Sequence, residues 1–140
     1  MSQENVELTY RAFDAFNRRD LDAFLALMDD DVEVVPRIGA VEGERSYRGH
    51  DGVRLWWNNL LDVFPDWNAE AVEMRDFGDF TMAPVRVRGH GGESGVPFDQ
   101  VICQVGEWRN GKLVRFRSHN SEAEALEAAG LSEQDAHADS

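Results

Sequence analysis

Three polar residues near the ends of strand-like segments could carry chemistry in this chain: Asp99, Ser118 and Asn120. A carboxylate beside apolar walls has a raised pKa, so Asp99 could take a proton from a bound molecule as a general base. The Ser118 hydroxyl and the Asn120 amide could donate hydrogen bonds to a carbonyl of that molecule. The ordinary alternatives are a solvated acid at a strand end, and polar groups satisfied by neighbouring backbone or water.

The Asn-Gly pair at 110–111 should position these residues, because it lies between two strand-like runs. Both turn residues of a two-residue hairpin need a positive φ, which Asn and Gly tolerate. A tight turn with regular pairing places Trp108 opposite Leu113, Val105 opposite Phe116, Cys103 opposite Ser118 and Val101 opposite Asn120. Residues directly opposite one another share a face of the sheet.

One predicted face is apolar with a polar end, as the wall of a small-molecule pocket would be. It carries Val101, Cys103, Val105, Val114, Phe116, Ser118 and Asn120. Asp99 has the same parity and would lie at the pocket mouth. The opposite face is polar and basic, which suits solvent or a partner subunit. It carries Gln100, Ile102, Gln104, Arg115, Arg117 and His119.

Other reactive residue types are dispersed along the chain. Cys103 faces inward with no histidine beside it, so it is interpreted as a small buried hydrophobe rather than a nucleophile. The register places His119 on the outer face, whereas His50 and His90 could reach the pocket rim. With the histidines dispersed, no metal triad is visible. Arg37 follows a predicted strand near the expected opening, where it could bind a substrate carboxylate or phenolate, or pair with one of many nearby acids.

The predicted pocket wall combines helical aromatic residues with strand residues. Tyr10 and Trp56 are interpreted as core or cavity wall rather than as a dedicated cofactor site. The predicted ligand-binding residues are Tyr10, Phe13, Arg37, Trp56, Leu60, Val101, Cys103 and Phe116.

Composition narrows the class of protein. The chain has 140 residues, 42% of them hydrophobic, which suits one globular domain. Its net charge of −13, from 27 acidic against 14 basic residues, argues against nucleic acid and anionic membrane surfaces as partners. No apolar run is long enough to span a membrane, and the N-terminus does not resemble a signal peptide. The single cysteine excludes an internal disulfide, and a reducing cytoplasm is the simplest setting.

The order of elements predicts an α+β fold. We expect one helix after Ser2, one capped by Asp20 and one from about Asp51 to Phe64. The predicted strands lie at about 32–37, 67–77, 80–88, 97–108 and 112–120. Ser121-Glu122-Ala123-Glu124 is a capping box for a short last helix that ends at Gly130. A curved sheet with three helices on its concave side encloses a cone-shaped cavity. A single domain should span 1–131, followed by a polar tail at 132–140.

Several segments resemble the SnoaL-like, or polyketide cyclase-like, proteins of the nuclear-transport-factor-2-like superfamily. The resemblance covers roughly residues 3–131, and the matching segments are 13–24, 47–53, 63–66, 111–119 and 124–131. It implies a cone-shaped half-barrel with a curved, mostly antiparallel sheet. It also implies no required cofactor and commonly a homodimer packed through the outer sheet face. The superfamily includes isomerases, cyclases, epoxide hydrolases and non-catalytic binding domains, so the fold alone does not select a function.

The resemblance also identifies where the enzymes of the superfamily carry acid–base residues. The carboxylate base of ketosteroid isomerases corresponds to Val34 or Val35, and their carboxylic acid before the last hairpin to about Cys103. Their first-helix tyrosine falls near Ala12 or Phe13, and the last-strand aspartate of epoxide hydrolases corresponds to Ser118. These acid–base sets are therefore largely absent.

Two hypotheses follow from the sequence. The first is a cofactor-independent domain that binds a small apolar molecule and isomerises, cyclises or hydrolyses it, with Asp99, Ser118 and Asn120 as the catalytic residues. The alternative is a non-catalytic ligand-binding or dimerisation domain. The missing acid–base residues favour the alternative.

Overall fold

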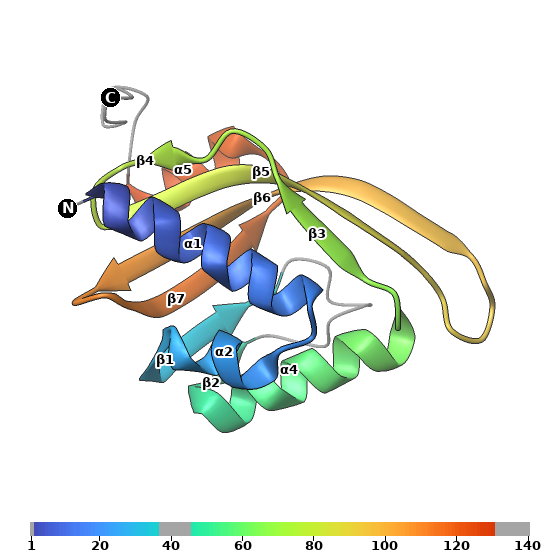
Figure 1. The fold of residues 1–140 in the computed structure, drawn as a ribbon. Coiled ribbons are helices and arrows are strands. Elements are labelled where there is room, and N and C mark those ends of the chain that lie inside the picture. Colours follow the sequence, from blue (N-terminus) through green and yellow to red (C-terminus); the bar gives the residue numbers. More distant parts are fainter. Residues whose placement is uncertain (1, 37–45, 131–140) are drawn as a thin grey trace.

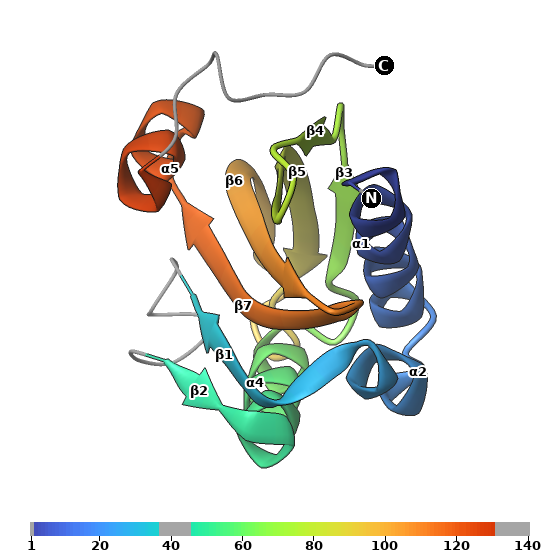
Figure 2. The same cartoon turned by 90° about the vertical axis from the view of Figure 1, so that its left-hand side faces the viewer.

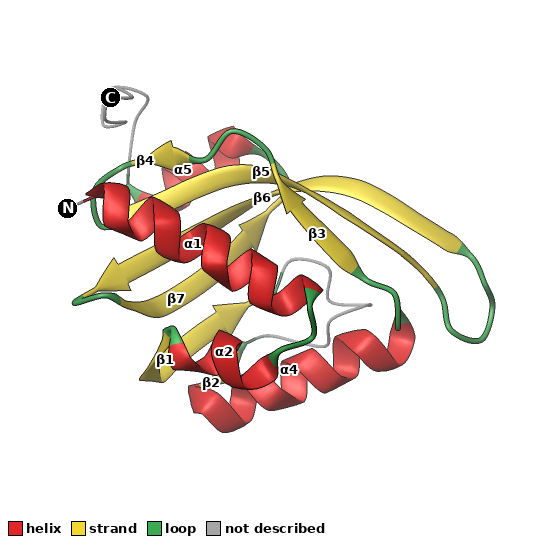
Figure 3. Cartoon of the chain, in the orientation of Figure 1, coloured by secondary structure: helices red, strands yellow, loops and turns green. Residues whose placement is uncertain are grey.

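The computed structural model describes residues 2–36 and 46–130 (Figures 1 and 3). The helices are α1 (Ser2–Asn17), α2 (Leu21–Ala26), α4 (Gly49–Val63) and α5 (Glu122–Ala129). The strands are β1 (Met28–Val35), β2 (Tyr47–Arg48), β3 (Asn68–Ala71), β4 (Arg75–Asp76), β5 (Phe80–His90), β6 (Pro97–Arg109) and β7 (Lys112–His119).

The strands form a strongly curved sheet in the order β2-β1-β7-β6-β5-β3, with β4 paired to β5. Neighbouring strands are antiparallel except β1 and β7, which are parallel. Helices α1, α2 and α4 lie on the concave side of the sheet, and α5 lies on its outer side (Figure 2). The predicted α+β cone, with three helices over the concave face and a short last helix, is confirmed.

Local signals in the sequence account for several element ends. The Asp20 side chain accepts a hydrogen bond from the backbone N–H of Ala23 (3.1 Å) and begins α2. Ser121 does the same for Glu124 (3.1 Å) at the start of α5. Gly130 then takes the left-handed conformation (φ 70°) that ends this helix, as the sequence predicts.

Aromatic rings form the centre of the core between the helices. Phe16, Phe24, Trp56 and Trp57 are all buried and pack with ring centroids 4.9–6.2 Å apart. Such stacked, tilted and edge-to-face pairs contribute beyond simple area burial. The cluster fixes α1, α2 and α4 to one another on the concave side.

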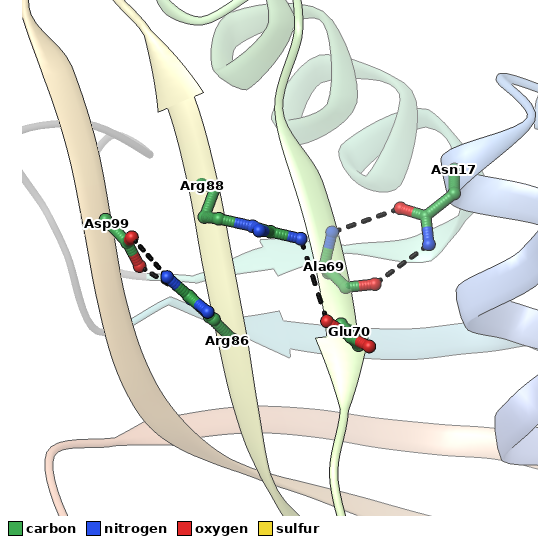
Figure 4. A network of polar contacts seen from close by, with 6 residues as sticks. All are labelled: Asn17, Ala69, Glu70, Arg86, Arg88 and Asp99. Carbon is green, nitrogen blue, oxygen red and sulfur yellow. Dashed lines mark hydrogen bonds and ion pairs between the residues drawn. The ribbon is translucent and has the colours of Figure 1, made fainter.

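Strand β3 lies at one edge of the sheet, and α1 covers part of that edge. Asn17 donates through Nδ2 to the carbonyl oxygen of Ala69 (2.8 Å) and accepts at Oδ1 from its N–H (3.1 Å) (Figure 4). Its amide therefore pairs with β3 as another strand would, and blocks further strand addition at this point. The contact also holds the end of α1 against the sheet.

The hairpin between β6 and β7 has the predicted turn but not the predicted register. Asn110 and Gly111 have φ values of 53° and 75°, and Arg109 pairs with Lys112. The register then shifts, because Glu107 pairs with Arg115 and Val114 has no partner. One extra residue on one strand is a β-bulge. The bulge inverts the face assignment of β6 relative to β7, so the predicted face of β6 was wrong.

Two further boundaries differ from prediction. Residues 29–31, which precede the strand predicted at 32–37, belong to β1 within an irregular stretch between Met28 and Glu33. The predicted strand at 67–77 divides into β3 and β4. In the described ranges no helix is long and apolar enough to cross a membrane. The predicted tail, 132–140, lies outside the described residues.

Candidate ligand pocket

The concave face of the sheet and the helices enclose an apolar pocket. Its empty space, counted together with solvent at the mouth, is about 620 Å³. The helices contribute Thr9, Ala12, Phe13, Phe16, Phe24 and Trp56. The sheet and its connections contribute Met28, Trp67, Ala69, Val87, Ile102, Gln104, Gly106, Trp108, Leu113 and Phe116. An apolar lining with a few polar groups is typical of a small-molecule site.

A chain of hydrogen bonds satisfies most polar groups of this lining. The indole Nε1 of Trp108 donates to Thr81 Oγ1 (3.0 Å), and Thr9 Oγ1 donates to the carbonyl of Asn5 (2.7 Å). The two threonine oxygens are 2.9 Å apart. Because Thr9 has only one hydroxyl hydrogen, Thr81 is the donor of this pair. The chain connects α1 to β5 and β6, and leaves little hydrogen-bonding capacity for a ligand.

Gln104 is the polar residue at the centre of the sheet wall. It pairs with Ala83 on β5 and with Ser118 on β7, so the three residues share the concave face. Gln104 Nε2 donates to Ser118 Oγ (3.2 Å), whereas Gln104 Oε1 is buried and has no hydrogen-bond partner. Ser118 itself is buried and is not among the lining residues.

The described lining contains no acidic, basic, histidine, cysteine or tyrosine side chain. Acid–base catalysis needs a titratable group within hydrogen-bond reach of the reacting atoms. The described wall of the pocket therefore supplies binding surface and hydrogen bonds, but no proton acceptor or donor of suitable pKa.

Asp99 does not lie at the pocket, so the prediction that places it at the pocket mouth was wrong. It pairs with Arg88 on the outer face of the sheet, where Arg86 holds its carboxylate through two hydrogen bonds of 3.0 and 2.7 Å (Figure 4). The hydrogen bond from Arg86 lowers the pKa of Asp99 below its usual 3.8, the opposite of the expected shift. The inverted face of β6 is the cause.

The same inversion moves Val101 and Cys103 away from the pocket. Val101 is 61% exposed on the outer face. Cys103 is buried under α5, in a cluster with Val105 and Leu126. Burial raises the pKa of its thiol to about 11, which agrees with the interpretation of Cys103 as a small hydrophobe. The structure contradicts its predicted place in the ligand site.

The remaining predicted residues divide between the pocket and other places. Phe13, Trp56 and Phe116 line the pocket. Tyr10 is 45% exposed on α1, and Leu60 is buried in the core without reaching the lining.

Two more predicted residues do not contribute to the described site. Asn120 is exposed, and its backbone N–H donates to Glu124 (3.4 Å) at the start of α5. Arg37 lies outside the described residues.

None of the three candidate histidines is a lining residue. His50 Nε2 lies 3.2 Å from the carbonyl oxygen of Met28. The exposed His90 pairs with Asp66 through Nδ1 (2.8 Å). His119 lies opposite Cys103 on the outer face, where the sequence placed it. Over the described part of the chain, no group of three or more His, Cys, Asp or Glu residues could hold a metal ion.

Sequence reasoning missed the residues of β6 that do line the pocket: Ile102, Gln104, Gly106 and Trp108. One available signal was the isolated Gly106 within a strand, which often marks a close approach. A Cβ at this position would lie 3.0 Å from Trp108 Nε1 and 3.1 Å from Thr81 Oγ1. Gly106 therefore makes room for the indole and its hydrogen bond.

The chain belongs to the SnoaL-like domain family, because the sequence model of this family matches residues 10–116. Members of this family include small-molecule-binding proteins related to isomerases and cyclases. A comparison with curated proteins finds no match.

Solved structures share the fold over most of the chain. A nuclear-transport-factor-2-like protein of unknown function from Burkholderia pseudomallei is 23% identical, with a TM-score of 0.76, and the match covers 89% of this chain and 95% of that one. TerC, co-crystallised with polyporic acid, is 20% identical, with a TM-score of 0.75 and coverage of 89% and 96%. A Catenulispora acidiphila protein of ketosteroid-isomerase-like fold, in complex with trimethylamine, is 16% identical, with a TM-score of 0.71 and coverage of 90% and 94%. At these identities the likeness shows the fold alone.

Proposed function

We propose that this protein binds a small, largely apolar molecule in the pocket and does not transform it by acid–base catalysis. The observation that carries the proposal is the lining itself, which is apolar and aromatic and has no titratable side chain among the described residues. Burial of apolar ligand surface against such a wall supplies the binding free energy. This is the non-catalytic alternative that the sequence already favoured.

Two solved neighbours carry small molecules, polyporic acid in TerC and trimethylamine in the Catenulispora protein. Both facts concern those proteins. They support the proposal only in that this fold is able to hold small organic molecules, and the ligand of this chain has to be judged from its own lining.

The proposal can be tested with a neutral apolar fluorophore such as N-phenyl-1-naphthylamine, whose emission rises on leaving water. Wild-type protein should bind it at the pocket. Ala12→Phe adds a ring to a lining residue and should weaken binding by about tenfold or more, since part of the cavity is filled. Ala128→Phe adds the same ring to an exposed position on α5 and is the matched control.

Circular dichroism should show that both variants fold. Failure of the wild type to bind the fluorophore, or equal affinity in Ala12→Phe and wild type, would overturn the proposal. If the wild type turned over a substrate of the isomerases, cyclases or epoxide hydrolases of the superfamily, the non-catalytic part of the proposal would be wrong.

A homodimer packed through the outer sheet face is a second candidate function. Val101, an exposed apolar side chain, lies there beside the half-exposed Arg86–Asp99 pair. Arg88 also pairs with Glu70 across the sheet (3.6 Å). A surface that carries both charge signs around an apolar centre can complement itself across a two-fold axis.

A further inference from the structure

Among the described residues, Oε1 of Gln104 is a buried hydrogen-bond acceptor without a partner. It is a side-chain atom of a residue that lines the pocket, on the central strand of the concave wall. A buried acceptor without a donor costs the free energy of its lost hydration. The free protein therefore carries a penalty at the pocket, and a suitable ligand could remove it.

The other polar groups of the lining do not offer the same opportunity. The hydroxyl of Thr9 and the indole N–H of Trp108 are engaged in the hydrogen-bond chain through Thr81. Gln104 Nε2 is held by Ser118 Oγ on the same face of the sheet. Gln104 Oε1 is thus the polar atom of the described lining that is left to bind a polar group of a ligand.

We propose that the ligand of this pocket is an apolar molecule with one hydrogen-bond donor, a hydroxyl or N–H group, which Gln104 Oε1 accepts. This inference rests on the proposed function, because it specifies the ligand of the same site. The oxygen is shut off from solvent in the free protein, so binding requires a small turn of the amide that brings Oε1 to the ligand and keeps Nε2 within reach of Ser118 Oγ. The terminal torsion of glutamine is broad, which keeps the cost of that turn small.

Three bicyclic compounds of nearly the same shape test the inference: indole donates an N–H, whereas benzofuran and indene donate nothing. Calorimetric titration of the wild type should give an affinity for indole about tenfold higher than for indene or benzofuran. Gln104→Met keeps an unbranched side chain but has no amide. It should bind indene as the wild type does and lose the preference for indole.

Gln100→Met is the matched control, since Gln100 lies on the same strand, is exposed and is not a lining residue. It should keep the preference. Equal affinities of the wild type for indole and indene would overturn the inference while the proposed function stands. So would a preference for benzofuran, or a preference for indole that persists in Gln104→Met. If the wild type binds none of the three compounds, both the inference and the proposed function fail. The wild-type comparison decides the matter even if Gln104→Met does not fold.

Discussion

The buried hydroxyl of Thr81 should be one of the costliest polar groups to remove from this protein. Thr81 is fully buried on β5, directly opposite Gly106, and its oxygen accepts the indole hydrogen of Trp108. Thr81→Val keeps the shape of the side chain and removes only its hydrogen-bonding capacity. The substitution therefore isolates the hydrogen-bond chain that connects α1 to the pocket wall.

The expected loss of stability depends on which hydrogen bonds Trp108 and Thr9 keep in the variant. Trp108 is 2% exposed, so its N–H would be left in the interior without its acceptor, at a cost of about 1–3 kcal/mol. Thr9 would lose an accepted bond but still donate to Asn5. We expect Thr81→Val to lower the free energy of unfolding by about 2 kcal/mol, a large part of the ~5–15 kcal/mol typical of a domain.

Urea unfolding followed by far-ultraviolet circular dichroism measures this loss without depending on tryptophan emission. The same substitution in a Trp108→Phe background should cost at least about 1 kcal/mol less, because no indole N–H remains to be orphaned. A loss below about 0.5 kcal/mol, or an equal loss in both backgrounds, would refute the reasoning.

Two further predictions concern the outer face of β6. Val101→Glu should convert the proposed homodimer to a monomer in light scattering without changing fluorophore binding, since Val101 lies on the face opposite the pocket; a monomeric wild type would contradict the dimer. Because the pKa of Cys103 is raised from 9.0 to about 11, its thiolate fraction near pH 8 should be about 100-fold lower than in the unfolded chain. Iodoacetamide should accordingly modify the folded protein at least that much more slowly, with a rate that rises with pH; equal rates in buffer and in urea would show that the thiol is not protected.

Much of the fold could be predicted because its signals are local. The Asn-Gly turn, the Ser121 capping box and the left-handed Gly130 each act over a few residues, and the structure contains all three. The face assignment of β7 was also predictable. Phe116 and Ser118 lie on the concave side of the sheet, as expected from their alternation with charged neighbours.

The pocket face of β6 was mispredicted because it depends on the bulge at Val114. The sequence signal for the bulge is that Leu113 and Phe116 are both large apolar residues. In the structure both of them line the pocket. They are three positions apart, whereas a regular strand places every second residue on one face. Both can face inward only if one residue between them is left out of the pairing. Local preference for a tight turn gave no indication of this, since the turn itself is regular.

The ion pair of Asp99 with Arg86 could not be inferred either. It depends on the register between β5 and β6, which the β6–β7 turn and its bulge do not set. On β5, Arg86 and Arg88 alternate with Val85 and Val87, and the concave positions of β5 and β6 receive Val85, Val87 and Ile102.

The bulge thus determines the chemistry of the pocket as well as its shape. Without the extra residue, Cys103 rather than Gln104 would share the concave face with Ser118 on β7. With it, the carboxylate of Asp99 is directed outward to Arg86, and a neutral amide takes the central position on the wall. An amide does not ionise near neutral pH, but it can accept or donate a hydrogen bond. A described pocket wall whose central polar group is Gln104 therefore agrees with the proposed recognition of one polar group on an apolar ligand.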